Sequence, residues 1–280
     1  PLVTIRNASG KVIVQKDNDV GLFFDLRFAH KFDKAGRYTV EVRDSRFRGS
    51  PHWTYILRMG QFAPARVAVP AMVPTGQVSD LLFPQLGPFD KQAATKVTPS
   101  GVIDGRMMLA LKRSGDQLST WLPLRVSSLA ARVEKEPNDE LAQASLVEVP
   151  AALHGVIARP GDVDHFRVTL KKGVLYQVVV ETHTIGSPAD LELILLDAKG
   201  KEVSRADDSG LDEARMNVSP SADGEYTLVV RELVNWGGPE YAYAIRFAPR
   251  EPHLVLSSGI TRVALPQGTR QPLPLSLNQV

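Results

Sequence analysis

A repeat within the 280-residue chain constrains its fold more than any other feature of the sequence. Four short segments from the first 60 residues recur in the same order, each 188 to 190 residues further along. The pairs are NASGKV (7–12) with DAKGKEV (197–203), KDND (16–19) with ADDS (206–209), AGRYTVEV (35–42) with DGEYTLVV (223–230), and SPHWTYILR (50–58) with GPEYAYAIR (238–246). Four matches at nearly one offset indicate that the chain contains two copies of one structural unit.

This repeat predicts four segments, one of which is a complete module. Residues 134–248 form the complete copy, and residues 1–60 form the second half of a module whose first half is missing. Residues 61–133 join the two, and residues 249–280 begin a second joining domain. Because an apolar run stands at either end of the sequence, we expect the chain to be a piece of a longer polypeptide.

The local pattern predicts β-strands almost everywhere. Short runs rich in Val, Ile, Leu, Tyr and Thr are separated by Gly, Asp, Asn or Pro at intervals of roughly ten residues, which is typical of an antiparallel β-sandwich. The clearest runs are FRVTL (166–170), YQVVVET (176–182), LELILLDA (191–198), YTLVV (226–230) and YAYAIRF (241–247). NASGKV and DAKGKE have the composition of hairpin turns, since Asn or Asp opens such a turn and Gly accepts a positive φ.

The joining residues 61–133 predict a smaller β domain. Its expected strands are ARVAVP (65–70), RMMLALKR (106–113) and TWLPLRV (120–126). Residues 84–98 are polar, contain two prolines and are expected to form a loop.

Composition and charge exclude several classes of protein and site. The chain has no cysteine, which excludes disulfides, thiolate metal sites and a cysteine nucleophile. No apolar run is long enough to span a membrane. The net charge of +2 does not predict a nucleic-acid partner, and no nucleic-acid-binding motif accompanies the basic residues. Residues 134–248 carry 20 acidic and 11 basic side chains, so an acidic module lies between basic neighbours.

The stretch ARVEKEPNDELAQASL (131–146) is unusual because four carboxylates lie within seven residues. Like charges this close repel one another unless a cation lies between them. One interpretation is a solvated linker in which Asn138 or Asp139 caps a short helix over ELAQAS (140–145). The other interpretation is that the stretch is one half of a metal site.

Two further carboxylates, Asp162 and Asp164, lie downstream in a Gly-led turn that runs into a predicted strand. Hard divalent ions such as calcium take six to eight oxygen ligands from carboxylates, amides and backbone carbonyls. The candidate metal ligands are Glu134, Glu136, Asn138, Asp139, Asp162 and Asp164. Such a site would pin the linker to the sandwich. We expect a solvated loop, and no second ion, at another acidic group, Asp207, Asp208 and Asp212.

The sequence offers no catalytic motif. Its six histidines are scattered, and it contains neither an H-E-x-x-H zinc pair nor a G-x-S-x-G nucleophile elbow. His165 follows Asp164, but alternation along a strand would point these two side chains to opposite faces. We therefore expect no catalytic residue, and a hydrolase would need a cleft in which His165 meets a nucleophile.

The aromatic residues leave two interpretations open. A basic and aromatic loop in the first copy has a tryptophan in the matching loop of the second, and exposed aromatic residues of this kind either bind polysaccharide or protein or fix their own loops to the sandwich. The residues are Arg43, Arg46, Phe47, Arg48 and Trp53, with Trp236 in the matching loop. Outward-pointing Tyr241 and Tyr243, in one strip with Tyr176, would favour binding. If they are buried, a spacer is favoured.

Ordered motifs in residues 134–248 resemble the bacterial pre-peptidase C-terminal domain family. They are the E-P-N-D start (136–139), the G-D-x-D-x-F turn and strand (161–166), the D-x-x-G hairpin (197–200) and the D-G-x-Y strand (223–226). The match covers residues 134–248 fully and residues 1–60 by the second half of the family's pattern. The resemblance implies jelly-roll-like β-sandwiches of exported bacterial proteins, which often stand behind a peptidase.

The collagen-binding domain of clostridial collagenases is a related family, in which an acidic linker of the form E-x-E-x-N-D binds calcium together with Asp residues of a later turn. The linker positions that fit are Glu134, Glu136, Asn138 and Asp139. Asp162 fits the first Asp of the turn, and Asp164 or His165 stands where a further Asp is expected. The joining segments resemble the small immunoglobulin-like linkers of large repetitive exported proteins.

The sequence therefore predicts an all-β fold of tandem antiparallel β-sandwich (jelly-roll-like) modules joined by smaller immunoglobulin-like β domains. We expect non-catalytic spacer or accessory modules with a calcium-stabilised linker, in a secreted, periplasmic or cell-surface bacterial protein that carries a peptidase or other enzyme elsewhere. The alternative is a module that binds a collagen-like protein or a polysaccharide. The modules are expected to be monomeric, without a nucleic-acid partner or a membrane span.

Overall fold

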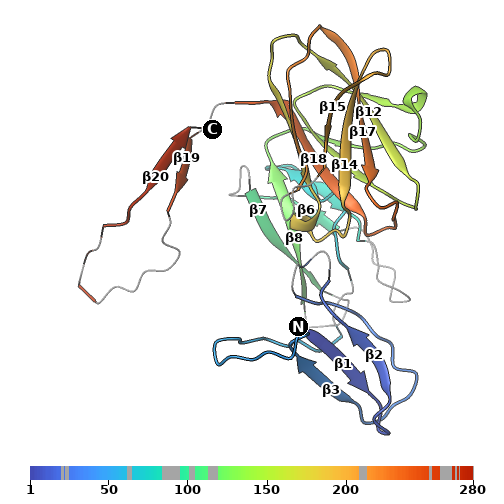
Figure 1. The fold of residues 1–280 in the computed structure, drawn as a ribbon, viewed down its shortest axis with the longest axis vertical. Coiled ribbons are helices and arrows are strands. Elements are labelled where there is room, and N and C mark those ends of the chain that lie inside the picture. The colour runs from blue at the N-terminus through green and yellow to red at the C-terminus, as the bar shows by residue number, and fades with distance from the viewer. Residues whose placement is uncertain are drawn as a thin grey trace. The chain divides into compact units, whose positions relative to one another are not determined.

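The computed structural model describes residues 1–19, 22, 25–61, 65–83, 95–100, 105–112, 119–207, 213–251, 254–258, 267–268, 270 and 272–279. It divides into two compact units, Pro1–Ala248 and Pro249–Val280. Nearly all regular structure is β (Figure 1), as the sequence predicts, and the two named helical elements among the described residues are single 3-10 turns. These turns are η2 (Leu141–Gln143) and η3 (His183–Ile185).

The central architecture is a sandwich of two five-stranded sheets. The first has the order β10 (Ser145–Val147), β12 (Val163–Leu170), β17 (Gly224–Glu232), β14 (Leu191–Asp197) and β15 (Glu202–Ala206). The second has the order β16 (Arg215–Val218), β13 (Tyr176–Glu181), β18 (Ala242–Pro249), β11 (Ala151–Val156) and β9 (Ala131–Val133). All five strands predicted for this region are present.

Alternating apolar side chains from both sheets fill the space between them. Phe166 from the first sheet and Ile245 and Phe247 from the second are fully buried in one cluster with Leu193. The neighbour of Leu193 in the strand, Glu192, faces away from this cluster, as the period of two requires. Since each such aliphatic or aromatic side chain contributes about 1.5–3 kcal/mol on burial, this core is the main source of the module's stability.

Two of the four outermost strands of the sandwich, one in each sheet, pair in parallel with their neighbours, whereas the other described pairs are antiparallel as predicted. β9 runs parallel to β11, and β10 runs parallel to β12. The linker 131–147 thus follows the same route as residues 151–170, from the second sheet to the first. The two crossings lie side by side, which places the acidic linker beside the turn before β12.

Three strands within the first 43 residues form a sheet that repeats three adjacent strands of the first sheet of the sandwich. Its order is β2 (Val12–Lys16), β1 (Leu2–Arg6) and β3 (Thr39–Arg43), and it corresponds to β15, β14 and β17. The strand registers agree as well. Equivalent pairs are Ile5–Val14 with Leu195–Ser204, and Val3–Val42 with Leu193–Val230. A register shift follows Ile5 in one copy and Leu195 in the other.

The hairpin turns of the two copies share the same hydrogen bonds. Asn7 Oδ1 accepts the N–H groups of Ser9 and Lys11 at 3.1 and 2.9 Å. Asp197 Oδ1 accepts those of Lys199 and Lys201 at 2.8 and 3.0 Å. Gly10 and Gly200 complete the turns at φ of 81° and 76°, in the left-handed region that favours glycine. The short-range pattern of the sequence therefore specifies this turn.

The loops that follow β3 and β17 also match. The Asp44 carboxylate accepts the N–H groups of residues 46 and 48, both at 2.9 Å. The Glu232 carboxylate accepts those of residues 234 and 236, at 2.9 and 2.7 Å. Phe47 and Asn235, which are equivalent, both have a positive φ, of 55° and 63°. The two copies thus share three strands, the hairpin turn between two of them and the loop after the third.

The joining residues form two small sheets over a separate apolar core. Their strands are β4 (Met72–Pro74), β8 (Ser119–Ser127) and β7 (Gly105–Lys112) in one sheet, and β5 (Ser79–Leu81) and β6 (Thr95–Val97) in the other. The strands predicted over 106–113 and 120–126 are confirmed by β7 and β8. The core includes Leu81, Leu122 and Leu124.

Two predictions for the joining residues are wrong. Residues 65–70 contain only an isolated bridge between Val69 and Leu82, since their apolar side chains are buried without regular alternation. Residues 95–97, predicted as loop, form β6, because Lys96 lies opposite Asp80 and its Nζ binds the carboxylate at 2.9 Å. The rest of the predicted loop, residues 84–94, lies outside the described residues, as do Asp208 and Asp212.

The predicted helix after the acidic stretch is shorter than expected. Only η2 forms, and Glu140, not Asn138 or Asp139, flanks its start. The Glu140 N–H donates to the side-chain oxygen of Gln143 at 3.0 Å. Asn138 and Asp139 do not cap it because their side chains are used elsewhere, as described below.

The unit Pro249–Val280 contains one antiparallel pair, β19 (Leu254–Ser257) with β20 (Ser276–Gln279). Among the residues that the structure describes, no helix has the length and apolar character needed to cross a membrane.

The outer face of the second sheet is partly covered by the joining residues. Ala152 and Ala244 pack against Met72, and Arg125 Nε binds Glu181 Oε1 at 2.8 Å. His154, two residues after Ala152 in β11, is buried on the same face. Burial lowers the pKa of His154 to about 3. Neither of its ring nitrogens has a hydrogen-bond partner within the described part of the chain.

We predict that Asp197→Ala lowers the melting temperature, whereas Asp197→Asn leaves it nearly unchanged. Alanine removes an acceptor shared by two backbone N–H groups, while asparagine retains it, as Asn7 does in the other copy. Differential scanning calorimetry at neutral pH measures both shifts. An asparagine variant as unstable as the alanine variant would mean that the charge, and not the acceptor, stabilises the turn.

We predict that His154→Leu raises the free energy of unfolding by roughly 1–3 kcal/mol at pH 7, since it removes an unpaired buried imidazole. The gain should increase as the pH falls from 6.5 towards 3. The unfolded imidazole binds a proton in that range while the folded one does not, a difference of at most ~1.4 kcal/mol per pH unit.

Urea unfolding between about pH 5 and 8 provides this measurement, with His52→Leu at an exposed position as the control. Equal pH slopes for wild type and His154→Leu would show that His154 is not buried in the neutral form.

Candidate metal centre

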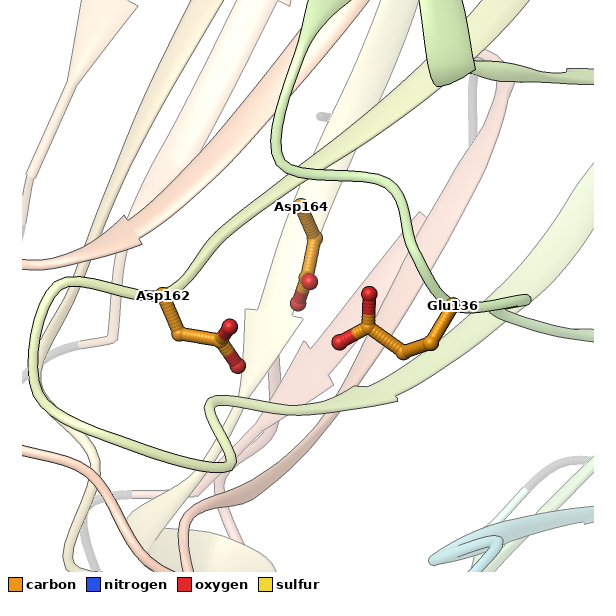
Figure 2. Close-up of side chains that lie close together, drawn as sticks. All are labelled: Glu136, Asp162 and Asp164. Carbon is orange, nitrogen blue, oxygen red and sulfur yellow. The ribbon is translucent and has the colours of Figure 1, made fainter.

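Three carboxylates from two separate segments converge at one end of the sandwich. Glu136 lies in the linker between β9 and η2, Asp162 precedes β12, and Asp164 is its second residue. One oxygen from each lies within 4.8 Å of the others. Figure 2 shows all three carboxylates pointing towards a common point. Asp162 and Asp164 are buried and Glu136 is exposed, so the group is open to solvent on the linker side.

A tight turn positions Asp162. Its Oδ2 accepts the N–H of Ala158 at 2.6 Å, and its own N–H donates to the carbonyl of Arg159 at 3.2 Å. Gly161 takes a φ of 85° in this turn. The other oxygen, Oδ1, is buried and has no hydrogen bond within the described residues, although Arg159 Nη1 lies 2.9 Å away. The Arg159 guanidinium is thus the cation beside this buried oxygen, in an ion pair that lacks hydrogen-bond geometry.

Asn138 lies between the linker carboxylate and the sandwich carboxylate. Its N–H donates to Glu136 Oε2 at 2.9 Å. With its side-chain nitrogen turned towards the carboxylates, it donates to Glu136 Oε2 at 2.9 Å and to Asp164 Oδ1 at 3.1 Å. With the amide reversed, its oxygen joins the carboxylate oxygens. The residue can therefore act as a donor in the absence of a cation or as a ligand in its presence.

Glu134 lies deeper and is connected to Asp164 through Tyr243. The Tyr243 hydroxyl lies 2.6 Å from Asp164 Oδ2 and 3.4 Å from Glu134 Oε2, and Glu134 Oε1 accepts the N–H of Val156 at 2.8 Å. Burial, and after it the charge of Asp164, raises the pKa of Glu134 to about 9. Burial also raises the pKa of Asp164 to about 6. One proton thus stays on this pair at neutral pH unless a cation replaces it.

Asp139 does not join the group. Its Oδ2 accepts a hydrogen bond from Arg159 Nη2 at 2.7 Å, and its Oδ1 accepts one from Val163 N at 3.4 Å. The bond from Arg159 lowers the pKa of Asp139. Of the six predicted ligands, the structure brings together Glu136, Asp162 and Asp164, with Asn138 beside them. Glu134 lies deeper in the module, next to Tyr243, and Asp139 forms an ion pair with Arg159.

Three residues that matter here were not singled out in the sequence as part of the site. From the sequence, Tyr243 is a candidate only for a surface strip. Arg159 is not a candidate for the site, and Gly155 has no distinguishing pattern. A Cβ at Gly155 would lie 2.2 Å from the Tyr243 hydroxyl and 2.4 Å from Glu134 Oε2, so only glycine lets these groups approach the backbone. The position of Arg159 three residues before Asp162 was the one available signal.

His165 has a structural position and no nucleophile partner among the described residues. Its Nδ1 lies 2.9 Å from the Asn138 carbonyl oxygen, so Nδ1–H donates to that acceptor. Asp164 faces Tyr243 on the inner side of the sheet, and His165 faces the outer side, as alternation predicts. The Asp164–His165 pair is therefore not arranged for catalysis.

Tyr176, Tyr241 and Tyr243 do not form a surface strip. Tyr176 and Tyr243 belong to the core, and Tyr241 is partly buried against it. Trp236 is 59% exposed on the loop after β17. Because Tyr243 is buried and Tyr241 is partly buried, a spacer is favoured over a module with a broad aromatic binding face.

The ligand chemistry fits a hard cation. All available groups are carboxylate or amide oxygens, and the chain contains no thiolate. Calcium accepts such a set with flexible geometry, and water completes its coordination. The converging carboxylates of Glu136, Asp162 and Asp164, two of them buried, are the feature that such an ion would satisfy.

No protein-family model matches the chain. It is 35% identical over 126 residues to a probable subtilase-type serine protease of Deinococcus radiodurans, which covers 42% of this chain and 17% of the protease. The chain therefore spans about a sixth of that relative's length.

Among solved structures, the chain is similar to the pre-peptidase C-terminal domain of a Bacillus anthracis collagenase, with 14% identity and a TM-score of 0.31, covering 41% of this chain and 99% of that one. The chain resembles a pre-peptidase C-terminal domain. This is the resemblance that the sequence motifs predict.

A Clostridium perfringens structure of an M60 catalytic domain with two CBM51 domains matches at 14% identity and a TM-score of 0.30, over 92% of this chain and 29% of that one. TM-scores of this size do not establish a shared function.

We predict that Gly155→Ala destabilises the module by about 1–3 kcal/mol, because the new Cβ forces Tyr243 and Glu134 apart. Chemical denaturation measures the effect. Gly49→Ala is the matched control, since a Cβ there meets no atom within 4 Å. Equal stability of the two variants would contradict the close packing of Tyr243 and Glu134 over residue 155.

Proposed function

We propose that this chain consists of non-catalytic accessory modules of an exported bacterial protein, and that calcium stabilises the linker leading into the complete module. The observation that carries this proposal is the convergence of Glu136 from the linker with Asp162 and Asp164 from the sandwich. An ion held by both segments would join them. The sequence similarity to a probable subtilase-type protease supports a peptidase as the enzyme to which the modules are attached.

The mechanical role of the ion follows from the path of the chain. Residues 134–140 lead from β9, where the joining residues end, to η2. Without an ion, this segment is held by the bonds of Glu134 and Asn138 and by the pair Arg159–Asp139. With an ion, the repulsion among the carboxylates becomes attraction, and the linker is fixed to the turn before β12. The direction in which the module leaves its neighbour is then fixed as well.

The proposal includes that these modules work outside the cell. Extracellular calcium modules use weak sites, with dissociation constants of about 10⁻⁴–10⁻³ M, that are filled only where calcium is abundant. A site that is partly open to solvent and has three converging carboxylates suits that range. The modules would then be stiff outside the cell and more mobile before export.

We predict that calcium raises the melting temperature of the chain relative to chelator. The stabilisation is RT ln(1 + [Ca]/Kd), about 3 kcal/mol at a hundredfold excess over Kd. In Glu136→Gln/Asp162→Asn the rise should disappear, and the variant in chelator should be at least as stable as wild type because it removes charge repulsion. Calorimetry with calcium, magnesium and chelator tests this.

Glu140→Gln is the matched control, since Glu140 belongs to the same acidic stretch but is exposed beside η2. It should keep the full calcium response. No calcium shift in the wild type would show that the carboxylates form a solvated linker, and the module would then be a spacer without an ion.

A second candidate function, binding of a protein or polysaccharide, rests on the loop after β17. Leu233, Val234 and Trp236 are exposed there, and the Glu232 carboxylate holds the loop by two backbone bonds. A Cβ at Gly237 would lie 2.3 Å from the backbone of Arg159, so the loop is packed tightly on the turn near the metal centre. Loss of binding to collagen-like peptides or polysaccharides in Trp236→Ala, without loss of stability, would support this role.

A further inference from the structure

An exposed apolar segment follows the first copy of the half-sandwich. Residues 54–59 are exposed throughout and form no strand. The repeat aligns them with β18, since SPHWTYILR and GPEYAYAIR are 188 residues apart. The turn that leads in is also the same, because Trp53 N donates to Ser50 O and Tyr241 N donates to Gly238 O, each at 3.0 Å.

In the complete module this segment is the middle strand of its sheet. β18 lies between β13 and β11, and its inward side chains belong to the core. Tyr243, Ile245 and Phe247 are nearly or completely buried there. Both neighbouring strands come from residues 151–181, in the first half of the module.

The equivalent side chains of the first copy are open to solvent. The exposed fractions are 55% for Trp53, 67% for Tyr55, 40% for Leu57 and 66% for Met59. In the sheet of the first copy, Val40 and Val42 of β3 are half-buried, whereas the equivalent Leu228 and Val230 are fully buried. Val3 and Ile5 of β1 are buried, as are their equivalents Leu193 and Leu195. Soluble proteins rarely expose four large apolar side chains with strand alternation unless a partner covers them.

We propose that residues 53–59 are a docking strand that is completed by β-strand addition from the first half of a module like residues 134–190. The repeat identifies the occupant, since the strands that cover β18 are known from the second copy. A strand placed as β11 is beside β18 would add antiparallel main-chain hydrogen bonds, and the opposite sheet would bury Trp53, Tyr55, Leu57 and Met59. This inference does not depend on calcium.

The test uses the chain's own first half as the donor. Residues 131–190 are fused ahead of the complete chain, so that Asp190 is joined to Pro1, which stands at the position of Leu191. Hydrogen exchange of residues 54–59 is then compared between the chain and the fusion. We expect fast exchange in the chain and exchange slower by about 100-fold or more in the fusion.

Variants separate docking from an unspecific effect of the fusion. Tyr55→Asp should leave the melting temperature of the unfused chain unchanged, because Tyr55 is exposed, and lower that of the fusion. Changing the equivalents of Leu153 and Val178 to Asp in the fused copy alone should abolish the protection. A third fusion carries Trp53→Tyr, Leu57→Ile and Met59→Phe, which reproduces the side chains of β18 and removes any mismatch with the donor.

Absence of protection in both the first and the third fusion overturns the proposal. Light scattering of the unfused chain over a range of concentrations tests the other occupant. A dimer in which residues 54–59 are protected, and which Tyr55→Asp dissociates, would assign the strand to a second copy of this chain and would also overturn the proposal.

Discussion

The parallel course of two chain segments is the constraint on which the complete module depends. β9 pairs with β11 and β10 pairs with β12, so the linker and the first two strands of the body cross from one sheet to the other side by side. This crossing closes one end of the sandwich. It also brings Glu136 of the linker to Asp162 and Asp164, which no local interaction could achieve. Strand pairing thus brings the three carboxylates together, although their negative charges repel one another.

The electrostatics of the centre follow from that geometry. Arg159 is paired with Asp139 and Asp162, and it leaves the charges of Glu136 and Asp164 without a cationic side chain within the described part of the site. The buried pair Glu134–Asp164 holds a proton because burial and like charge both disfavour a second negative charge. A divalent cation can replace both the proton and the donor role of Asn138.

Local features could be predicted from the sequence because their causes are local. The hairpin at Asp197 needs only one side-chain oxygen and a glycine three residues later, and Asn7 and Gly10 repeat it. The strands with clear alternation were found for the same reason. The sequence does not predict β6 because its residues are polar and its pairing depends on the opposite strand. It wrongly predicts a strand at residues 65–70 because apolar residues are buried there without forming a strand.

The sequence by itself determined the all-β class, the repeat and the two acidic segments of the candidate centre, since composition, periodicity and turn residues act over a few positions. Only the tertiary structure decided which oxygens meet. It turned Asp139 to Arg159 and placed Tyr243 and Gly155, from strands far apart in the chain, against Glu134. It also left residues 54–59 exposed while the matching β18 is buried. The physical reason is that side-chain contacts depend on which strands pair across long sequence distances, and a short-range pattern carries no such information.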